Sequence, residues 1–294
     1  MAGLSGSRLV SSVAMVRDDG ADVNARSGWL LALVVALLAG CSTASVSPGL
    51  VDVGEGRLLY LTCQGQGTPT VVLEAGGMGN SNSWSPVQPA IAEFTRVCAY
   101  DRAGEGHSSS LPAHDSFEAI VRDLHALLEA AGIEGPYVVA GHSFGGRLIP
   151  HFANLYPDDV VGMVLLDPGH EDFSARAEAA LTPLEWQQYL EAGGGRISGF
   201  EDAQGPSNLG APGDFPLVVV SAAHPIDRPG VSSEVNEKLY DILVGLHREM
   251  VALSPDGTHI IAEGSGHGVQ IDRPDLVVDA IRQVVESARN TEDR

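Results

Sequence analysis

The sequence around Ser143 constrains the fold more than any other part of the chain. An apolar run rich in β-branched residues, 137–140, is followed at once by Gly-His-Ser-Phe-Gly at 141–145 and then by an amphipathic segment. The run predicts a buried strand, and the segment predicts a helix. A strand that turns directly into a helix pushes the corner side chain out above the sheet, and glycines beside it avoid a steric clash. The pattern therefore predicts an exposed serine at position 143.

This arrangement resembles the nucleophile elbow of the α/β-hydrolase family, in its serine esterase or lipase-like branch. Residues 101–108, Asp-Arg-Ala-Gly-Glu-Gly-His-Ser, are similar to the family's Asp-x-x-Gly-x-Gly-x-Ser turn, whose role is structural. The resemblance extends over residues 51–288. It implies an α/β fold with a mostly parallel eight-stranded sheet, helices on both faces and a short cap insertion at about residues 170–215.

The resemblance also predicts a catalytic histidine after the serine in the chain. His267 lies in a glycine-rich loop, 264–268, which follows a short apolar run at 259–261 and precedes an amphipathic segment that starts near Pro274. A serine hydroxyl is a poor nucleophile until a base takes its proton, and that base needs an acid to fix its tautomer. We therefore expect His267 to be the base for Ser143.

Two aspartates are candidates for the acid of this triad. Asp167 comes directly after the apolar run 160–166, at the strand end where ligands gather in open α/β sheets. Asp227 follows the next apolar run, 217–220, but several residues intervene. Family members use either location. We favour Asp167 because it ends its strand directly, and we keep Asp227 as the alternative.

The glycine-rich loop at residues 75–79 is the expected source of an oxyanion donor. In the resembled family this loop usually contains His-Gly-x, whereas here Glu-Ala-Gly-Gly stands at residues 74–77. The difference is in side chains, and the donor is a backbone N–H. We expect Gly77 to supply it, with Met78 as the alternative, and the N–H of Phe144 to be the second donor.

The N-terminal segment has the pattern of a bacterial export signal. An apolar run at 29–40 follows Arg26 and ends in Leu-Ala-Gly before Cys41, which is similar to a lipobox. We therefore expect residues 1–41 to be a signal peptide with lipidation at Cys41, residues 42–49 to be a polar tether, and residues 50–290 to be the hydrolase domain. The protein would then be exported and lipid-anchored to the bacterial cell membrane, outside the cytoplasm.

The resemblance pairs the remaining two cysteines. It places the second and fourth strands side by side, with Cys63 on one and Cys98 on the other. Because export leads to an oxidising compartment, we expect a disulfide between them.

Composition limits the partners. The formal charge of −21 argues against nucleic acid and anionic membrane surfaces as electrostatic partners, so membrane contact is expected through the lipid anchor only. Neither metal-ligand spacing nor a dinucleotide fingerprint is present in the sequence, and we expect no cofactor. The predicted substrate is a small ester or acyl compound. The alternatives are a cofactor-free haloperoxidase or C–C hydrolase on the same triad, and a non-catalytic envelope binding protein on this scaffold.

Overall fold

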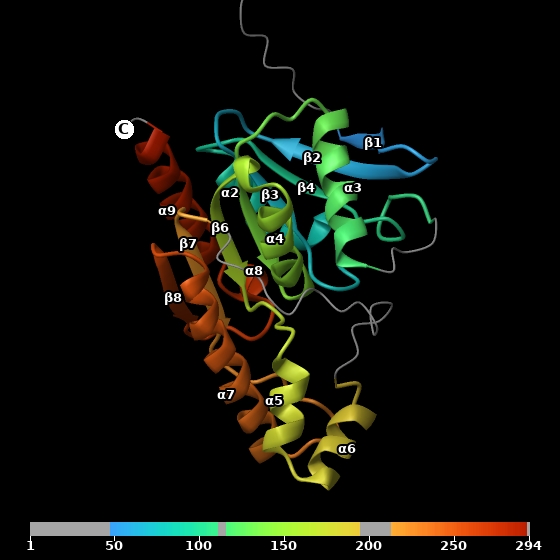
Figure 1. Ribbon diagram of the computed structural model, residues 1–294, viewed down its shortest axis with the longest axis vertical. Helices are drawn as coiled ribbons and strands as arrows, with labels where there is room; N and C mark the ends of the chain where they lie inside the picture. Colours follow the sequence, from blue (N-terminus) through green and yellow to red (C-terminus); the bar gives the residue numbers. More distant parts are fainter. Residues whose placement is uncertain (1–47, 111–115, 195–212, 293–294) are drawn as a thin grey trace, which may run out of the picture. The chain divides into compact units, whose positions relative to one another are not determined.

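The centre of the computed structural model is a single sheet of eight strands (Figure 1). The structure describes residues 48–110, 116–194 and 213–292, so the predicted signal peptide, Cys41 and most of the tether lie outside the described residues. The strands are β1 (Gly49–Asp52), β2 (Leu58–Gln64), β3 (Thr70–Glu74), β4 (Val97–Tyr100), β5 (Tyr137–His142), β6 (Val160–Leu166), β7 (Leu217–Ala222) and β8 (Gly257–Ala262).

The order of the strands places β5, which leads to Ser143, near the middle of the sheet. The order is β1-β2-β4-β3-β5-β6-β7-β8. β2 pairs antiparallel with both β1 and β4. The remaining neighbours in this order, from β4 through β3 and β5 to β8, pair parallel. The expected mostly parallel, eight-stranded α/β sheet is confirmed. Because the carboxyl ends of β3, β5, β6, β7 and β8 meet at one edge, the loops that follow them converge there.

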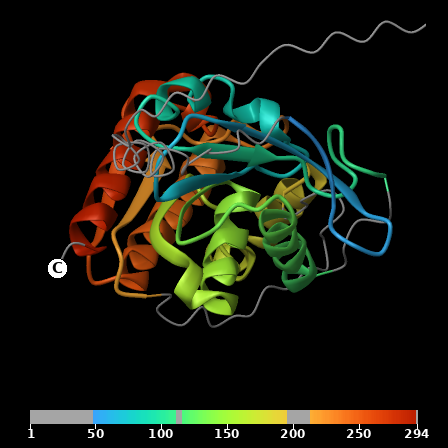
Figure 2. The ribbon, with the colours of Figure 1, turned by 90° about the horizontal axis from the view of Figure 1, so that it is seen from above.

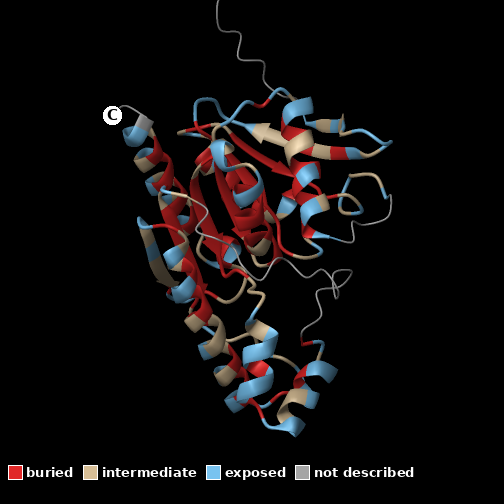
Figure 3. Ribbon diagram, viewed as in Figure 1, coloured by how far each residue is buried: buried red, intermediate tan, exposed pale blue. Residues whose placement is uncertain are grey.

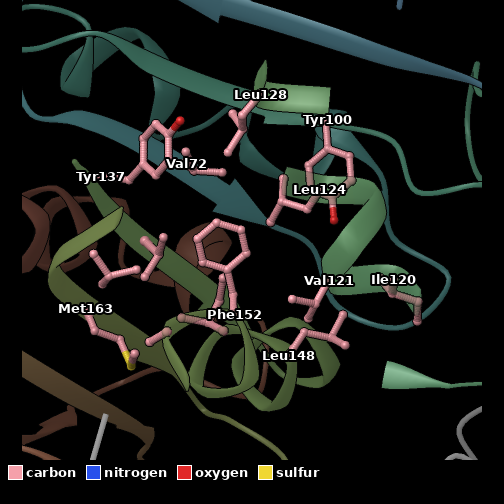
Figure 4. Close-up of a cluster of buried hydrophobic side chains, with 14 of the residues drawn as sticks. Val72, Tyr100, Ile120, Val121, Leu124, Leu128, Tyr137, Leu148, Phe152 and Met163 are labelled. Carbon is pink, nitrogen blue, oxygen red and sulfur yellow. The ribbon is translucent and has the colours of Figure 1, made fainter. Parts of the chain in front are cut away.

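Helices cover both faces of the sheet, because the strand side chains alternate between two apolar cores. Val72, Val139 and Leu165 pack with α3 (Phe117–Ala130) and α4 (Phe144–Leu155) on one face. Figure 4 shows Val72 in this cluster with Leu124 and Phe152. Val71 and Val138 pack with α9 (Pro274–Glu292) on the other face. In Figure 2 the sheet separates α3 and α4, drawn in green, from α9, drawn in red. The helices are α2 (Gln88–Ile91), α3 (Phe117–Ala130), α4 (Phe144–Leu155), α5 (Phe173–Ala180), α6 (Pro183–Glu191), α7 (Ser233–Met250), α8 (Val269–Asp272) and α9 (Pro274–Glu292).

Two helices, α5 and α6, lie between β6 and β7 in the chain and pack against the first half of α7 (Figure 1). Their shared core is small, and their outer surfaces are exposed, in contrast to the buried sheet (Figure 3). Tyr189 is the largest buried side chain of this small core. α5 and α6 lie within the segment 170–215 that was expected to be a cap insertion, of which residues 195–212 lie outside the described residues, and they border the cavity described below.

The disulfide expected between Cys63 and Cys98 is present. The two residues are direct partners on the antiparallel strands β2 and β4, with their Cα atoms 4.1 Å apart. None of the helices formed by residues 48–110, 116–194 and 213–292 combines the length and apolar character needed to cross a bilayer.

Candidate active site

Ser143 sits at a sharp corner between β5 and α4. Its backbone has φ 53° and ψ −113°, a conformation that non-glycine residues rarely adopt and that is typical of functional sites. A Cβ on Gly141 would lie 2.5 Å from the carbonyl oxygen of Gly145, and a Cβ on Gly145 would lie 2.3 Å from that of Glu74. The two glycines are therefore required for the chain to turn here and to pack against the end of β3.

Ser143, His267 and Asp167 form a continuous hydrogen-bonded chain. The Nε2 atom of His267 lies 2.9 Å from Ser143 Oγ, and its Nδ1 atom lies 2.6 Å from Asp167 Oδ2. A carboxylate accepts but does not donate, so Nδ1 carries the proton and Nε2 is free to accept the serine proton. The Asp167 side chain is 3% exposed whereas that of His267 is 35% exposed, so the base faces the solvent side and the acid is enclosed.

The environment of Asp167 keeps its carboxylate ionised and oriented. Burial alone would raise its pKa, but the hydrogen bond with His267, together with the positive potential of His267 and His247 and the backbone N–H of Ala222, lowers the pKa below its ordinary value. That N–H donates to Asp167 Oδ1 at 2.9 Å. Asp167 itself has φ 41°, so β6 ends in a turn that directs its side chain toward the ends of β7 and β8.

The alternative acid, Asp227, occupies a different position. It lies in the loop between β7 and α7 and is exposed. Its Oδ1 atom accepts a long hydrogen bond, 3.5 Å, from the side-chain amide of Asn236. The structure therefore brings Asp167 to His267, and Asp227 to the start of α7.

A second histidine, His142, supports the loop that carries His267. Its Nε2–H donates to the carbonyl oxygen of His267 at 2.8 Å, and the two rings are 4.8 Å apart. Burial, and then repulsion from His267, lower the pKa of His142 to about 4. His142 is thus a neutral donor near pH 7, and it holds the His267 backbone beside the elbow without adding charge.

The loop after β3 lies directly against the elbow. A Cβ on Gly76 would be 3.5 Å from Ser143 Cβ. The N–H groups of Gly77 and Met78 donate to no acceptor among the described residues, and Met78 has φ 58° with a 71% exposed side chain. Phe144 begins α4, so its N–H lies at the positive N-terminal end of that helix. The loop that contains Gly77 and Met78 and the N-terminus of α4 thus both adjoin the serine.

Arg102 holds this loop against the end of β3, a role that was not predicted from the sequence. Its side chain is 5% exposed and forms an ion pair with Glu74. It also donates to the carbonyl oxygens of Ala75 at 2.7 Å and Gly76 at 2.5 Å. The planar guanidinium thus joins the end of β3 to the two residues that precede Gly77. The available sequence signal was its position in the Asp-x-x-Gly-x-Gly-x-Ser turn at residues 101–108, which was expected to be structural.

A second serine–histidine contact lies behind the triad. Ser221 Oγ is 2.7 Å from His247 Nδ1 and 2.8 Å from His259 Nε2. His247 Nε2 is 2.7 Å from the Pro168 carbonyl, which can only accept, so His247 Nδ1 accepts the Ser221 hydroxyl proton and His259 donates to Ser221. Ser221 and His247 are fully buried. A nucleophile must be reached by its substrate, so this set is a structural support for the segment after Asp167.

A cavity of about 210 Å³ opens beside the triad. Ser143, Asp167 and His267 form part of its wall, and the rest comes from α4, the segment after β6, the α5–α6 segment, the loop after β7 and α7. The substrate of Ser143 therefore has a defined space next to the nucleophile, bounded by the expected cap.

Comparison with known proteins agrees with this fold. A model of the α/β-hydrolase fold matches residues 69–204, which contain the elbow and Asp167. The chain has the α/β-hydrolase fold. A thermophilic esterase from Thermogutta terrifontis has the same fold, with a TM-score of 0.57 at 19% identity, over 82% of this chain and 98% of that protein.

Curated sequences also resemble this hydrolase-fold chain. The uncharacterized protein YqjL of Bacillus subtilis is 29% identical over 235 residues, which are 75% of this chain and 85% of that protein. Lipase LipV of Mycobacterium tuberculosis is 37% identical over 111 residues, which are 37% of this chain and 41% of that protein. The first similarity spans most of both chains, and the second is confined to a part of each.

Proposed function

We propose that the protein is a serine hydrolase that cleaves carboxylic esters through an acyl-enzyme. The observation that carries the proposal is the hydrogen-bonded path from Asp167 through His267 to Ser143, with both histidine nitrogens within 3 Å of their partners. The strained backbone of the serine supports it, because such strain persists where the surrounding structure imposes it.

The mechanism follows from the donors and acceptors around Ser143. Its Oγ attacks the ester carbonyl carbon while His267 Nε2 takes the hydroxyl proton, and Asp167 stabilises the resulting imidazolium. The N–H groups of Gly77 and Phe144 receive the developing oxyanion, a contribution of about 3 kcal/mol per donor. His267 then gives its proton to the leaving alkoxide, and a water molecule activated by His267 releases the acyl group.

Labelling with a fluorophosphonate and hydrolysis of 4-nitrophenyl butyrate test the proposal together. The purified protein should be labelled and active, and Ser143→Ala should lose both properties. Asp167→Asn should lower kcat by about 10⁴-fold, because the amide favours the wrong histidine tautomer. Asp227→Asn should change kcat by less than about twofold, because that residue is exposed and away from His267.

Ser221→Ala is the matched control for the nucleophile. Ser221 also contacts a histidine, but it is fully buried, so its variant should still be labelled. Labelling that survives Ser143→Ala and disappears in Ser221→Ala would contradict the assignment. An unmutated protein that is neither labelled nor active would instead indicate a binding protein on a hydrolase scaffold.

We also propose that the chain is exported and anchored through lipid on Cys41. The support is the sequence, in which an apolar run of signal-peptide length ends in Leu-Ala-Gly before that cysteine. The disulfide between Cys63 and Cys98 is consistent with folding in an oxidising compartment.

A further inference from the structure

Two arginines line the cavity beside Ser143, in a chain in which acidic residues outnumber basic ones by 38 to 17. They are Arg147 on α4 and Arg228 in the loop between β7 and α7. Acidic side chains are abundant in this protein, so most arginines are expected to have a carboxylate partner. Arginines without one in a pocket wall are therefore unexpected. The surroundings of the two side chains therefore indicate what the cavity binds.

Arg147 is held in place by apolar contacts. It lies in the first turn of α4, four residues after Ser143, and both residues line the cavity. Its guanidinium carbon is 4.8 Å from the centre of the Phe117 ring. A Cβ on Gly169 would lie 2.7 Å from Arg147 Cδ, so the arginine stem passes directly over the segment that follows Asp167. These contacts hold the stem of the side chain in place, but they bring no carboxylate into hydrogen-bond contact with the guanidinium.

No carboxylate lies within ion-pair distance of Arg147 among the described residues, and its Nε is buried without a hydrogen-bond partner. The nearest acidic influence is Glu171, which attracts Arg147 electrostatically but has its carboxylate 3.9 Å from His170 Nδ1. Burial lowers the pKa of Arg147, although a guanidinium stays charged near neutral pH. Arg147 as a whole is only partly buried and lines the cavity, so an anion bound there can reach its guanidinium, and a charge-assisted hydrogen bond would stabilise the pair.

Arg228, in the loop between β7 and α7, also packs on an aromatic ring and has no carboxylate partner among the described residues. Its guanidinium carbon is 5.3 Å from the centre of the Tyr189 ring, and its Nη1 donates only a long hydrogen bond, 3.3 Å, to the carbonyl of Ile226. Within the described part of the chain it too has no carboxylate at ion-pair distance. By contrast, several other arginines pair with a carboxylate: Arg57, Arg102, Arg122, Arg176 and Arg273.

We propose that the substrate is a short acyl ester that also carries a carboxylate, and that Arg147 and Arg228 bind this carboxylate while Ser143 attacks the ester carbonyl. The inference rests on the proposed hydrolase function. Guanidinium groups are suited to carboxylates because their donors match the two oxygens. A cavity of about 210 Å³ is smaller than those that hold drug-sized ligands, which favours a small substrate.

The reaction leaves the bound carboxylate unchanged. The Ser143 Oγ–carbon bond forms, the bond from that carbon to the alcohol oxygen breaks, and the serine proton passes through His267 to the alcohol. Water then cleaves the acyl-enzyme and restores Ser143. A carboxylate in the acyl part would produce a diacid, whereas one in the alcohol part would produce a hydroxy acid.

The test compares charged esters with neutral esters of nearly the same shape. For the acyl part, the pair is 4-nitrophenyl hydrogen glutarate and its methyl ester; for the alcohol part, it is 4-(butyryloxy)benzoate and its methyl ester. Spontaneous hydrolysis is subtracted. In at least one pair, kcat/KM should be about tenfold or more higher for the charged ester, and Arg147→Gln or Arg228→Gln should reduce that ratio about tenfold. Arg147→Lys, which keeps the charge, should retain part of the preference.

Arg176→Gln is the control, because Arg176 is exposed on α5 and pairs with Glu249; it should leave the ratio unchanged. A ratio near one for both pairs of esters, or a ratio that neither Arg147→Gln nor Arg228→Gln changes, would overturn the inference. Hydrolysis of the neutral esters would still support the proposed function in that case. If no ester is hydrolysed, calorimetry with glutarate decides. Binding to Ser143→Ala that weakens in Ser143→Ala/Arg147→Gln supports the anion site, and equal or absent binding refutes it.

Discussion

Acid should destabilise the fold through His247, the buried histidine behind Asp167. In the folded protein burial lowers the pKa of His247 from 6.5 to about 4, against the attraction of Asp167, whose Oδ1 is 3.9 Å from its Nδ1. In the unfolded chain the same imidazole takes up a proton near pH 6.5. Between these two values the unfolded state binds more protons, so the free energy of unfolding falls as the pH is lowered from 6.5 to 4.

The size of the effect follows from the two pKa values. At pH 4.5 the unfolded histidine is almost fully protonated and the folded one is mostly neutral, which corresponds to a loss of about 2.5 kcal/mol relative to pH 7. This is a large part of the 5–15 kcal/mol that is typical of a folded protein. Above about pH 7.5 both states are neutral at this residue, and no further change is expected from it.

Urea unfolding at pH 7 and pH 4.5 measures this contribution when the protein is compared with His247→Gln. Carboxylates and other histidines titrate in both proteins, so the quantity of interest is the difference between their two pH-dependent losses. The unmutated protein should lose about 2.5 kcal/mol more than His247→Gln. His224→Gln, at an exposed position, is the control and should behave like the unmutated protein. An equal loss in the unmutated protein and in His247→Gln would refute the reasoning.

Two further predictions concern the oxyanion loop and the anchor. Arg102→Lys should lower kcat for 4-nitrophenyl butyrate by about 10- to 100-fold with little change in KM, because the loss of the bonds to the Ala75 and Gly76 carbonyls displaces the Gly77 donor. Arg122→Lys, on the surface of α3, is its control, and an unchanged kcat in a folded Arg102→Lys protein would contradict this role. Cys41→Ala should abolish incorporation of labelled palmitate and move the protein from the membrane fraction to the soluble fraction; a labelled Cys41→Ala protein would exclude Cys41 as the lipidation site.

The sheet could be predicted from local sequence because its central strands are buried on both faces. Residues 70–74 and 160–166 are short apolar runs, and the structure has strands with these bounds. The adjacency of the second and fourth strands followed from the family resemblance. Strand ends at the edge were less well defined. The apolar run at 259–261 is two residues shorter at its start than β8, whose Gly257 and Thr258 have little hydrophobic character.

The polar contacts around the triad could not be predicted in the same way, because they join residues that are far apart in the chain. Ser221, His247 and His259 come from three different elements, and nothing in their local sequence indicates a shared hydrogen-bonded set. Arg147 is different, since it lies only four residues after Ser143, at the start of the predicted helix, and its nearness to the nucleophile could therefore be expected from the sequence. The environment of Arg228 depends on Tyr189, which belongs to the cap segment.

The position of Asp167 at the end of β6 has a consequence for how such a protein diverges. If the acid came from the later position, as the alternative Asp227 would have required, the loop after β7 would have to preserve the acid's geometry, and changes there would put catalysis at risk. Here that loop contains Arg228 and Asp227 and has no bond to the imidazole. The length and the charge of this loop can therefore change while the contacts between Asp167, His267 and Ser143 are kept. A set of natural or laboratory variants in this loop should differ widely in the acids and alcohols that they accept, at nearly constant turnover of simple neutral esters.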